Sequence, residues 1–206
     1  GISAEFNGGT HMSMEDIGVL RSIPELVIYE PVDVAQFKQA LPQIVAYEGP
    51  VYIRMFRKTI DDVFTDANYK FDLFGADCIQ EGTAVTIFCS GIMVQETMKA
   101  NEILKQEGID AEIINIHTIK PIDRDAVVAS AKKTGAVVVA ENHNVIGGLT
   151  SAVCEVLMEE YPVPLRAVGV KDRFGQVGKM PFLKEEYHMT AKDIVSAVKE
   201  VIRLNK

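Results

Sequence analysis

Residues 8–16 hold the side chains of this sequence with the clearest potential for chemistry. Two glycines lead into Thr10 and His11, and two carboxylates, Glu15 and Asp16, follow. Because glycine adopts backbone conformations closed to other residues, this turn can hold His11 tightly against a neighbouring group or ligand. Histidine changes its charge closest to neutral pH, which suits proton transfer. The pattern indicates a candidate catalytic site at His11. The alternative is that Gly9-Thr10-His11-Met12 is a cloning remnant, since such a run is also typical of one.

Arg57 is the second candidate. A Gly49-Pro50 turn precedes a predicted strand at residues 51–56, and Arg57 follows that strand directly. Ligands of open α/β sheets bind at the carboxyl ends of strands, where a guanidinium can grip a phosphate through two parallel hydrogen bonds. The alternative is a solvated arginine at a strand end. Arg54, inside the same strand, can form a structural ion pair.

A third polar group is the Asn142-His143-Asn144 run, which follows a predicted buried strand and precedes two glycines and a helix. It can form an anion site at the helix N-terminus, but a tight turn whose polar side chains satisfy the local backbone is favoured. His117 and His188 have no partner at a metal-ligand spacing, and no dinucleotide-binding glycine fingerprint is present. The sequence therefore predicts no metal site of its own.

Composition limits the classes of function. The 206 residues are 48% hydrophobic and 24% charged, and the formal net charge of -8 argues against nucleic acid as a partner. No apolar run approaches the roughly 20 residues that span a bilayer, and no signal peptide pattern opens the chain, so we expect no membrane segment. The three widely spaced cysteines, Cys78, Cys89 and Cys154, favour a reducing cytoplasm.

Apolar periodicity predicts alternating strands and helices, and therefore an α/β protein with a largely parallel sheet. Ser13 and Asp33 are expected to cap the first two helices. Pro42 predicts a kink or a break in the second helix, and Met98 is expected to face inward from the third. The expected strands are residues 26–29, 51–56, 84–89, 111–116, 136–140 and 165–170. The expected helices are residues 14–21, 34–45, 94–107, 124–133, 149–159 and 191–204.

The pattern divides the chain into two units. Residues 1–58 hold two strands and two helices, too few for a whole doubly wound domain, so they are predicted to be the second half of one. Residues 59–80 show no clean period and are predicted to be a linker. Residues 81–206 alternate strand and helix and are predicted to form a complete α/β domain.

Taken together, these segments resemble the C-terminal part of transketolase, in particular the smaller subunit of its split form. The resemblance covers essentially the whole chain and is specific through the number and order of its motifs. The first motifs are Gly9-Thr10-His11 with Glu15, Leu20-Arg21-Ser22-Ile23-Pro24, Glu30-Pro31 with Asp33, and Gly49-Pro50 before Arg57. Further motifs are Gly91-Ile92-Met93-Val94, Gly108-Ile109-Asp110-Ala111, Lys120-Pro121-Ile122-Asp123, Glu141-Asn142-His143, Gly147-Gly148-Leu149 and Asp172-Arg173-Phe174-Gly175.

The resemblance implies a partial pyrimidine-binding-type α/β domain, then a three-layer α/β/α transketolase C-terminal domain. It implies transfer of a two-carbon glycolaldehyde unit from a ketose phosphate to an aldose phosphate with thiamine diphosphate, as in the pentose phosphate pathway. His11 takes the role of contacting the substrate and reaction intermediate, and Arg57 that of binding the sugar phosphate. Asn7 stands where many relatives have an aspartate that reads hydroxyl stereochemistry, so the sugar preference is open.

The resemblance also implies that part of the machinery lies elsewhere. In the family, an upstream half-domain supplies the glutamate that activates the aminopyrimidine ring, and a separate domain holds the diphosphate and Mg²⁺. This chain is expected to start after those residues, to need an N-terminal transketolase subunit, and to be inactive alone. We expect a homodimer or a dimer of heterodimers.

Three alternatives stay open. 1-Deoxy-D-xylulose-5-phosphate synthase shares the Thr-His turn and the Gly-Pro strand, and the β subunits of 2-oxo-acid dehydrogenases share the C-terminal domain. Against both, the Glu15-Asp16 pair and the Arg173-Phe174-Gly175 run look more like transketolase. A non-catalytic assembly module is the third alternative, because the complete domain carries no strong site.

Overall fold

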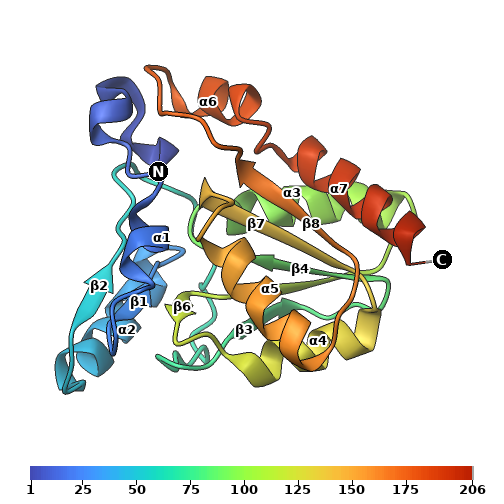
Figure 1. The fold of residues 1–206 in the computed structure, drawn as a ribbon, viewed down its shortest axis with the longest axis horizontal. Helices are drawn as coiled ribbons and strands as arrows, with labels where there is room; N and C mark the ends of the chain where they lie inside the picture. Colours follow the sequence, from blue (N-terminus) through green and yellow to red (C-terminus); the bar gives the residue numbers. More distant parts are fainter. Residues whose placement is uncertain (206) are drawn as a thin grey trace.

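A five-stranded sheet forms the centre of the protein, whose computed structural model describes residues 1–205 (Figure 1). The strand order is β3-β5-β4-β7-β8. Four strands are parallel, and β3 pairs with β5 in antiparallel fashion at one edge. The predicted α/β class with a mostly parallel sheet is therefore confirmed. The strands are β3 (Asp77–Gln80), β4 (Val85–Cys89), β5 (Ala111–Asn115), β7 (Val137–Asn144) and β8 (Leu165–Val170).

Two pairs of helices cover the two faces of this sheet (Figure 1). Because strand side chains alternate between faces, Ile87 of β4 packs with one pair of helices and its neighbour Phe88 packs with the other. All five residues of β4 are buried, as expected of a strand covered on both sides. This arrangement confirms the three predicted layers. One pair is α3 (Met93–Gln106) with α7 (Ala191–Leu204), and the other is α4 (Arg124–Thr134) with α5 (Leu149–Glu160).

The N-terminal residues form a second sheet of three strands in the order β2-β1-β6. β1 (Val27–Tyr29) is parallel to β2 (Val51–Ile53) and antiparallel to β6 (Thr118–Lys120). Since β6 comes from the C-terminal part of the chain, this small sheet joins the two parts. The remaining elements are the 3-10 helices η1 (Ile2–Asn7) and η2 (Gly9–His11), and the α-helices α1 (Asp16–Leu20), α2 (Val34–Ala46) and α6 (Met180–Glu186).

Three expected strand assignments are wrong. β2 ends at Ile53 instead of residue 56, because Arg54 leaves the sheet and enters a buried cluster of carboxylates. β7 continues as far as Asn144, so the polar run that was favoured as a turn is part of a buried strand. Residues 59–80, in which no regular element was expected, include the edge strand β3.

Asp33 caps α2 as predicted, since its side chain accepts a hydrogen bond from the Gln36 N–H at 2.7 Å. Ser13 does not cap α1, which begins after Glu15 without a side-chain cap. Within residues 1–205, no helix combines the length and the apolar character needed to cross a membrane.

Two helix details also differ from expectation. α2 continues through Pro42 without a break, because Ala40 and Ile44 on either side of it are buried and hold the helix to the core. Met98 is 39% exposed and does not face inward. The reason is that the buried face of α3 includes Thr97, the residue before Met98, together with Val94, Asn101 and Leu104.

Candidate active site

A pocket of about 150 Å³ lies where the Thr-His turn meets the chain that follows β2. Two of the residues predicted from the sequence, His11 and Arg57, both line this pocket. Asp16, Tyr52 and Arg54 are also among the lining residues. The fold therefore places a histidine and two guanidinium groups around one small polar space.

The turn that carries His11 orients its imidazole ring. Thr10 Oγ1 lies 2.9 Å from His11 Nδ1, and within residues 1–205 the Nε2 atom makes no hydrogen bond. The side chain is exposed, so Nε2 is open to a ligand. Asn7, the third predicted residue, ends η1 just before that turn and lies outside the pocket, and its side-chain amide donates to the Ala4 carbonyl at 3.2 Å.

Arg57 lies on the loop after β2, not directly at a strand end, because β2 stops at Ile53. The side chain is exposed and forms no ion pair with the part of the chain that the structure describes. Its neighbour Lys58, by contrast, lies 3.5 Å from a carboxylate oxygen of Glu5 on η1. Arg57 is thus the guanidinium in this pocket that is free to bind an anion.

Arg54 is buried, and each of its three side-chain nitrogens donates a hydrogen bond. Nε donates to Asp16 Oδ2 at 2.8 Å, Nη1 to Glu30 Oε1 at 2.5 Å, and Nη2 to the Ser13 carbonyl at 2.7 Å. Tyr52 Oη donates to the same Asp16 oxygen at 2.9 Å. The structural ion pair that the sequence left open for Arg54 is therefore present, and it forms one wall of the pocket.

The charges in this cluster stabilise one another. Burial alone would raise the pKa of Asp16, but the Arg54 charge and the hydrogen bonds from Arg54 and Tyr52 bring that pKa below its usual value. Burial likewise opposes the charged form of Arg54, yet Glu30 and Asp16 raise the pKa of the guanidinium. Asp16 and Arg54 therefore favour each other's ionised form.

The cluster also reaches the five-stranded sheet. Ser90, directly after β4, donates its hydroxyl to Glu30 Oε2 at 2.7 Å. Gly91 has a φ of 52°, and a Cβ atom there would lie 2.7 Å from the Glu30 carboxyl carbon. Only glycine allows this close approach, so Gly91 explains why the Glu30 carboxylate can sit against the turn after β4.

The end of β7 holds the N-terminal segment in place. Asn142 Oδ1 accepts a hydrogen bond from the Ile2 N–H at 2.9 Å, and the Asn144 N–H donates to the Met14 carbonyl at 2.8 Å. These contacts lie on either side of the Thr-His turn in sequence. The polar run at the end of β7 therefore acts as a clamp on that turn.

The anion site considered at the start of α5 is filled by a carboxylate of this chain. Glu141 accepts hydrogen bonds from the Leu149 N–H at 2.7 Å, and from the Thr150 N–H and hydroxyl at 3.0 and 2.5 Å. Burial raises the pKa of Glu141 to about 7, although these hydrogen bonds oppose the rise. The α5 N-terminus is therefore already satisfied.

His143, between the two clamp asparagines, is buried and neutral. Its Nδ1 lies 2.6 Å from the Asn144 carbonyl, which can only accept, so Nδ1 carries the proton and Nε2 accepts from the Gly18 N–H at 3.4 Å. Burial, followed by the nearby Arg54 charge, lowers the pKa of His143. This histidine therefore fastens α1 to β7.

The Thr-His turn also packs against residues 171–179, the loop before α6. A Cβ atom on Gly9 would lie 2.5 Å from the Gly175 carbonyl oxygen, so the two backbones are in direct contact. The Arg173-Phe174-Gly175 run is thus spatially adjacent to His11. The sequence contained the run as a motif but offered no signal for this contact.

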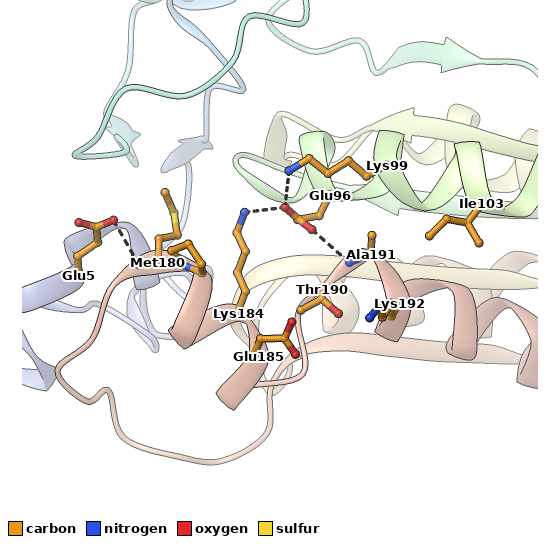
Figure 2. Close-up of a pocket in the computed structure, with 11 residues that line it drawn as sticks. Glu5, Glu96, Lys99, Ile103, Met180, Lys184, Glu185, Thr190, Ala191 and Lys192 are labelled. Atoms are coloured by element: carbon orange, nitrogen blue, oxygen red, sulfur yellow. Dashed lines mark hydrogen bonds and ion pairs between the residues drawn. The ribbon is translucent and has the colours of Figure 1, made fainter.

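A larger pocket, of about 400 Å³, lies between α3, α6 and the start of α7 (Figure 2). Its buried carboxylate, Glu96, accepts hydrogen bonds from Lys99 at 3.0 Å, Lys184 at 2.7 Å and the Ala191 N–H at 3.1 Å. These polar groups satisfy one another. None of the residues predicted as catalytic or substrate-binding lines this pocket.

Two family models together match most of the chain. Residues 75–194 match the family model described as Transketolase, C-terminal domain, and residues 1–61 match Transketolase, pyrimidine binding domain. The chain belongs to the transketolase family.

Individual relatives agree with this placement. The chain is 55% identical over 201 residues to the 6-deoxy-6-sulfo-D-fructose transketolase subunit SqwH of Clostridium sp. (strain MSTE9), covering 98% of this chain and 62% of that protein. It is 33% identical over 196 residues to one of the subunits of the apulose-4-phosphate transketolase of Phocaeicola vulgatus, covering 95% and 62%. The chain thus spans about three-fifths of the length of these relatives.

The chain is also similar to a solved split transketolase and to an enzyme of a sister family. A solved structure titled "Split gene transketolase, inactive beta4 tetramer" superimposes with a TM-score of 0.90 at 41% identity, covering 96% of this chain and 64% of that one. The 1-deoxy-D-xylulose-5-phosphate synthase of Heliobacterium modesticaldum is 34% identical over 197 residues, covering 95% of this chain but 30% of the enzyme. 1-Deoxy-D-xylulose-5-phosphate synthase, one of the alternatives considered for this sequence, is therefore related to this chain.

The titration of Glu141 gives a testable pH dependence. Its pKa is raised from 4.5 to about 7 in the folded chain, so its contribution to stability is complete below pH 4.5 and is lost as the pH rises through 7. Glutamine at this position does not titrate. We expect the free energy of unfolding of wild type relative to Glu141→Gln to fall by about 3 kcal/mol between pH 4.5 and 8.

Urea denaturation of both proteins across that pH range measures this difference. Glu102→Gln, which changes an exposed glutamate of α3, controls for the change of side chain. A wild-type advantage that stays constant or grows with rising pH would contradict the assignment.

Proposed function

We propose that this chain is the C-terminal part of a transketolase, which transfers a two-carbon glycolaldehyde unit from a ketose phosphate to an aldose phosphate. The observation that carries the proposal is the pocket that combines His11 and Arg57 in a chain of the transketolase family. A histidine with a free ring nitrogen and an unpaired guanidinium match the two ends of a sugar phosphate.

The roles of the residues follow from their geometry. Thr10 holds Nδ1 of His11, which leaves Nε2 to form a hydrogen bond or exchange a proton with a substrate oxygen. The exposed fork of Arg57 can bind the terminal anion with two parallel hydrogen bonds. Asn7 ends η1 outside the pocket, and its proposed contact with a substrate hydroxyl, made without adding charge, rests on the family resemblance alone.

The pocket does not accommodate the cofactor of this family by itself. Its volume of about 150 Å³ is below the roughly 300 Å³ at which small-molecule sites begin. Its one carboxylate, Asp16, is paired with Arg54 and Tyr52 through Oδ2, and a single carboxylate does not provide the oxygen-rich ligand set that Mg²⁺ and a diphosphate need. Carbon–carbon bond cleavage relies on carbanion chemistry that bound thiamine diphosphate supplies.

We therefore propose that a separate N-terminal transketolase subunit holds most of the thiamine diphosphate and the Mg²⁺, and that this chain alone is inactive. The relatives at 55% and 33% identity are both named as subunits, and the solved neighbour is titled as an inactive tetramer of one chain type. All three cysteines are free, in keeping with the proposed reducing cytoplasm.

The first test is glycolaldehyde transfer by the full-length protein mixed with its N-terminal subunit, thiamine diphosphate and Mg²⁺. We expect His11→Ala to lower the turnover number by about 10²- to 10⁴-fold, because a positioned acid or base is lost. His188→Ala, which removes an exposed histidine near the start of α7, is the control and should leave turnover unchanged.

Full activity in His11→Ala would contradict the assigned site. Turnover of pyruvate instead of a ketose would support a 1-deoxy-D-xylulose-5-phosphate synthase or 2-oxo-acid dehydrogenase reaction. Failure with every donor would favour the non-catalytic assembly module.

A sulfonated ketose is a second candidate substrate. It is favoured by the relative at 55% identity, whose name specifies 6-deoxy-6-sulfo-D-fructose. A sulfonate and a phosphate both present three oxygens to a guanidinium, but the sulfonate carries one negative charge and the phosphate close to two. Arg57, as a single free guanidinium, fits either group.

The anion can be identified through Arg57. We expect Arg57→Ala to raise KM about 10- to 100-fold for the ketose with the preferred terminal anion, because charge-assisted hydrogen bonds are lost. KM for a neutral ketose should change little. Arg203→Ala, at an exposed site on α7, is the control, and equal effects on charged and neutral donors would contradict the role of Arg57.

A further inference from the structure

The Thr-His turn is short and makes few bonds to the rest of the chain. η2 spans only Gly9–His11, and within residues 1–205 the hydrogen bonds of Thr10 and His11 stay between residues 7 and 11. A single 3-10 turn has poor hydrogen-bond geometry and adds little rigidity by itself. Because Arg54 and the end of β7 hold only the segments on either side, the turn itself depends on packing.

This packing comes from the loop of residues 171–179, which joins β8 to α6 and lies beside η1 at the top of Figure 1. A Cβ atom on Gly175 would lie 2.9 Å from the Gly9 Cα and 3.1 Å from the side chain of Met12, which is buried. The loop therefore touches the chain directly before and directly after the Thr-His pair.

The contact between Gly9 and Gly175 leaves no room for a side chain. A Cβ atom on Gly9 would lie 2.5 Å from the Gly175 carbonyl oxygen. Neither glycine has a positive φ, so the close approach of the two backbones, and not an unusual conformation, requires glycine here. Since both partners are backbone atoms, neither can rotate aside as a side chain can. A methyl group at Gly175 would therefore displace the turn.

The end of α6 holds the loop in its place. Tyr187 is buried, and its Oη donates to the Phe174 carbonyl at 2.8 Å. Arg173 forms an ion pair with Glu186 at 2.5 Å, and its guanidinium carbon lies 5.1 Å from the centre of the Tyr187 ring. The two residues directly before Gly175 are thus fixed to α6 and to the residue that follows it.

We propose that Gly175 and Tyr187 are positioning residues for His11. Tyr187 fixes the Phe174 carbonyl, Gly175 lies against Gly9, and the turn then presents Nε2 of His11 at one place in the pocket. The inference rests on the proposed function, which gives this nitrogen a role in the reaction. Neither positioning residue is among those that line the pocket, so their loss should affect turnover and not substrate binding.

The ring signals of His11 report its position independently of catalysis. In the ¹⁵N-labelled full-length protein, Gly175→Ala should shift the NMR signals of the His11 ring nitrogens, because the displaced turn disturbs the hydrogen bond between Thr10 and Nδ1. Gly75→Ala is the matched control and should leave these signals unchanged. Its new methyl group would meet only the exposed side chain of Asp72, at 3.2 Å.

Glycolaldehyde transfer by the full-length protein with its N-terminal subunit, thiamine diphosphate and Mg²⁺ is the second readout. Gly175→Ala should lower kcat about 10- to 100-fold with KM for the ketose within about twofold, because misplacing a reacting group by about 1 Å has an effect of this size. Tyr187→Phe, which keeps the ring beside Arg173 and removes one hydrogen bond, should lower kcat about three- to tenfold.

The outcomes separate the positioning role from the proposed function. Unchanged His11 signals in both variants would overturn the positioning role, whether or not the protein transfers glycolaldehyde. Shifted signals with an unchanged kcat would overturn it too, because the place of His11 would then not matter to the reaction. A wild type without any transfer activity would contradict the proposed function, while the His11 signals would still decide whether the loop holds the turn.

Discussion

The buried Arg54 guanidinium is the group on which the geometry of the site depends. It bonds the Ser13 carbonyl and Asp16, just after the Thr-His turn, and Glu30, just after β1. Glu30 in turn accepts from Ser90 at the end of β4. One side chain therefore fixes His11, the loop of Arg57 and the two sheets relative to one another.

Because these charges are buried, removing one member of the cluster strongly destabilises the others. A buried carboxylate without its partner is strongly unfavourable, and breaking a buried pair typically costs about 3–5 kcal/mol. Loss of Arg54 would leave both Asp16 and Glu30 uncompensated, a cost comparable to a large share of the stability of an ordinary domain. Such a cluster adds little net stability over an apolar core, but it permits a single arrangement of the pocket wall.

Sequence reasoning predicted the fold well where local signals agree. The bounds of β8 and α7 match expectation, because their signals are local. β8 is a short run of mostly apolar residues, and α7 has a capping residue at its start and apolar residues along one face. It missed β3, β6 and α6, which are short and depend on tertiary partners. His11 and Arg57 were found as motifs, whereas the Arg54–Glu30–Ser90 chain joins distant positions that no local pattern connects.

Amide hydrogen exchange of Arg54→Met against the wild type tests the central claim most directly. We predict a larger increase in exchange rate in residues 13–20 than in β4 and β7, because Arg54 bonds Ser13 and Asp16 directly and reaches β4 only through Glu30 and Ser90. Arg54→Lys, which retains the charge but not the three-nitrogen geometry, should give an intermediate rate. Wild-type protection of residues 13–20 in Arg54→Met would show that the turn is held by other contacts and would contradict the account.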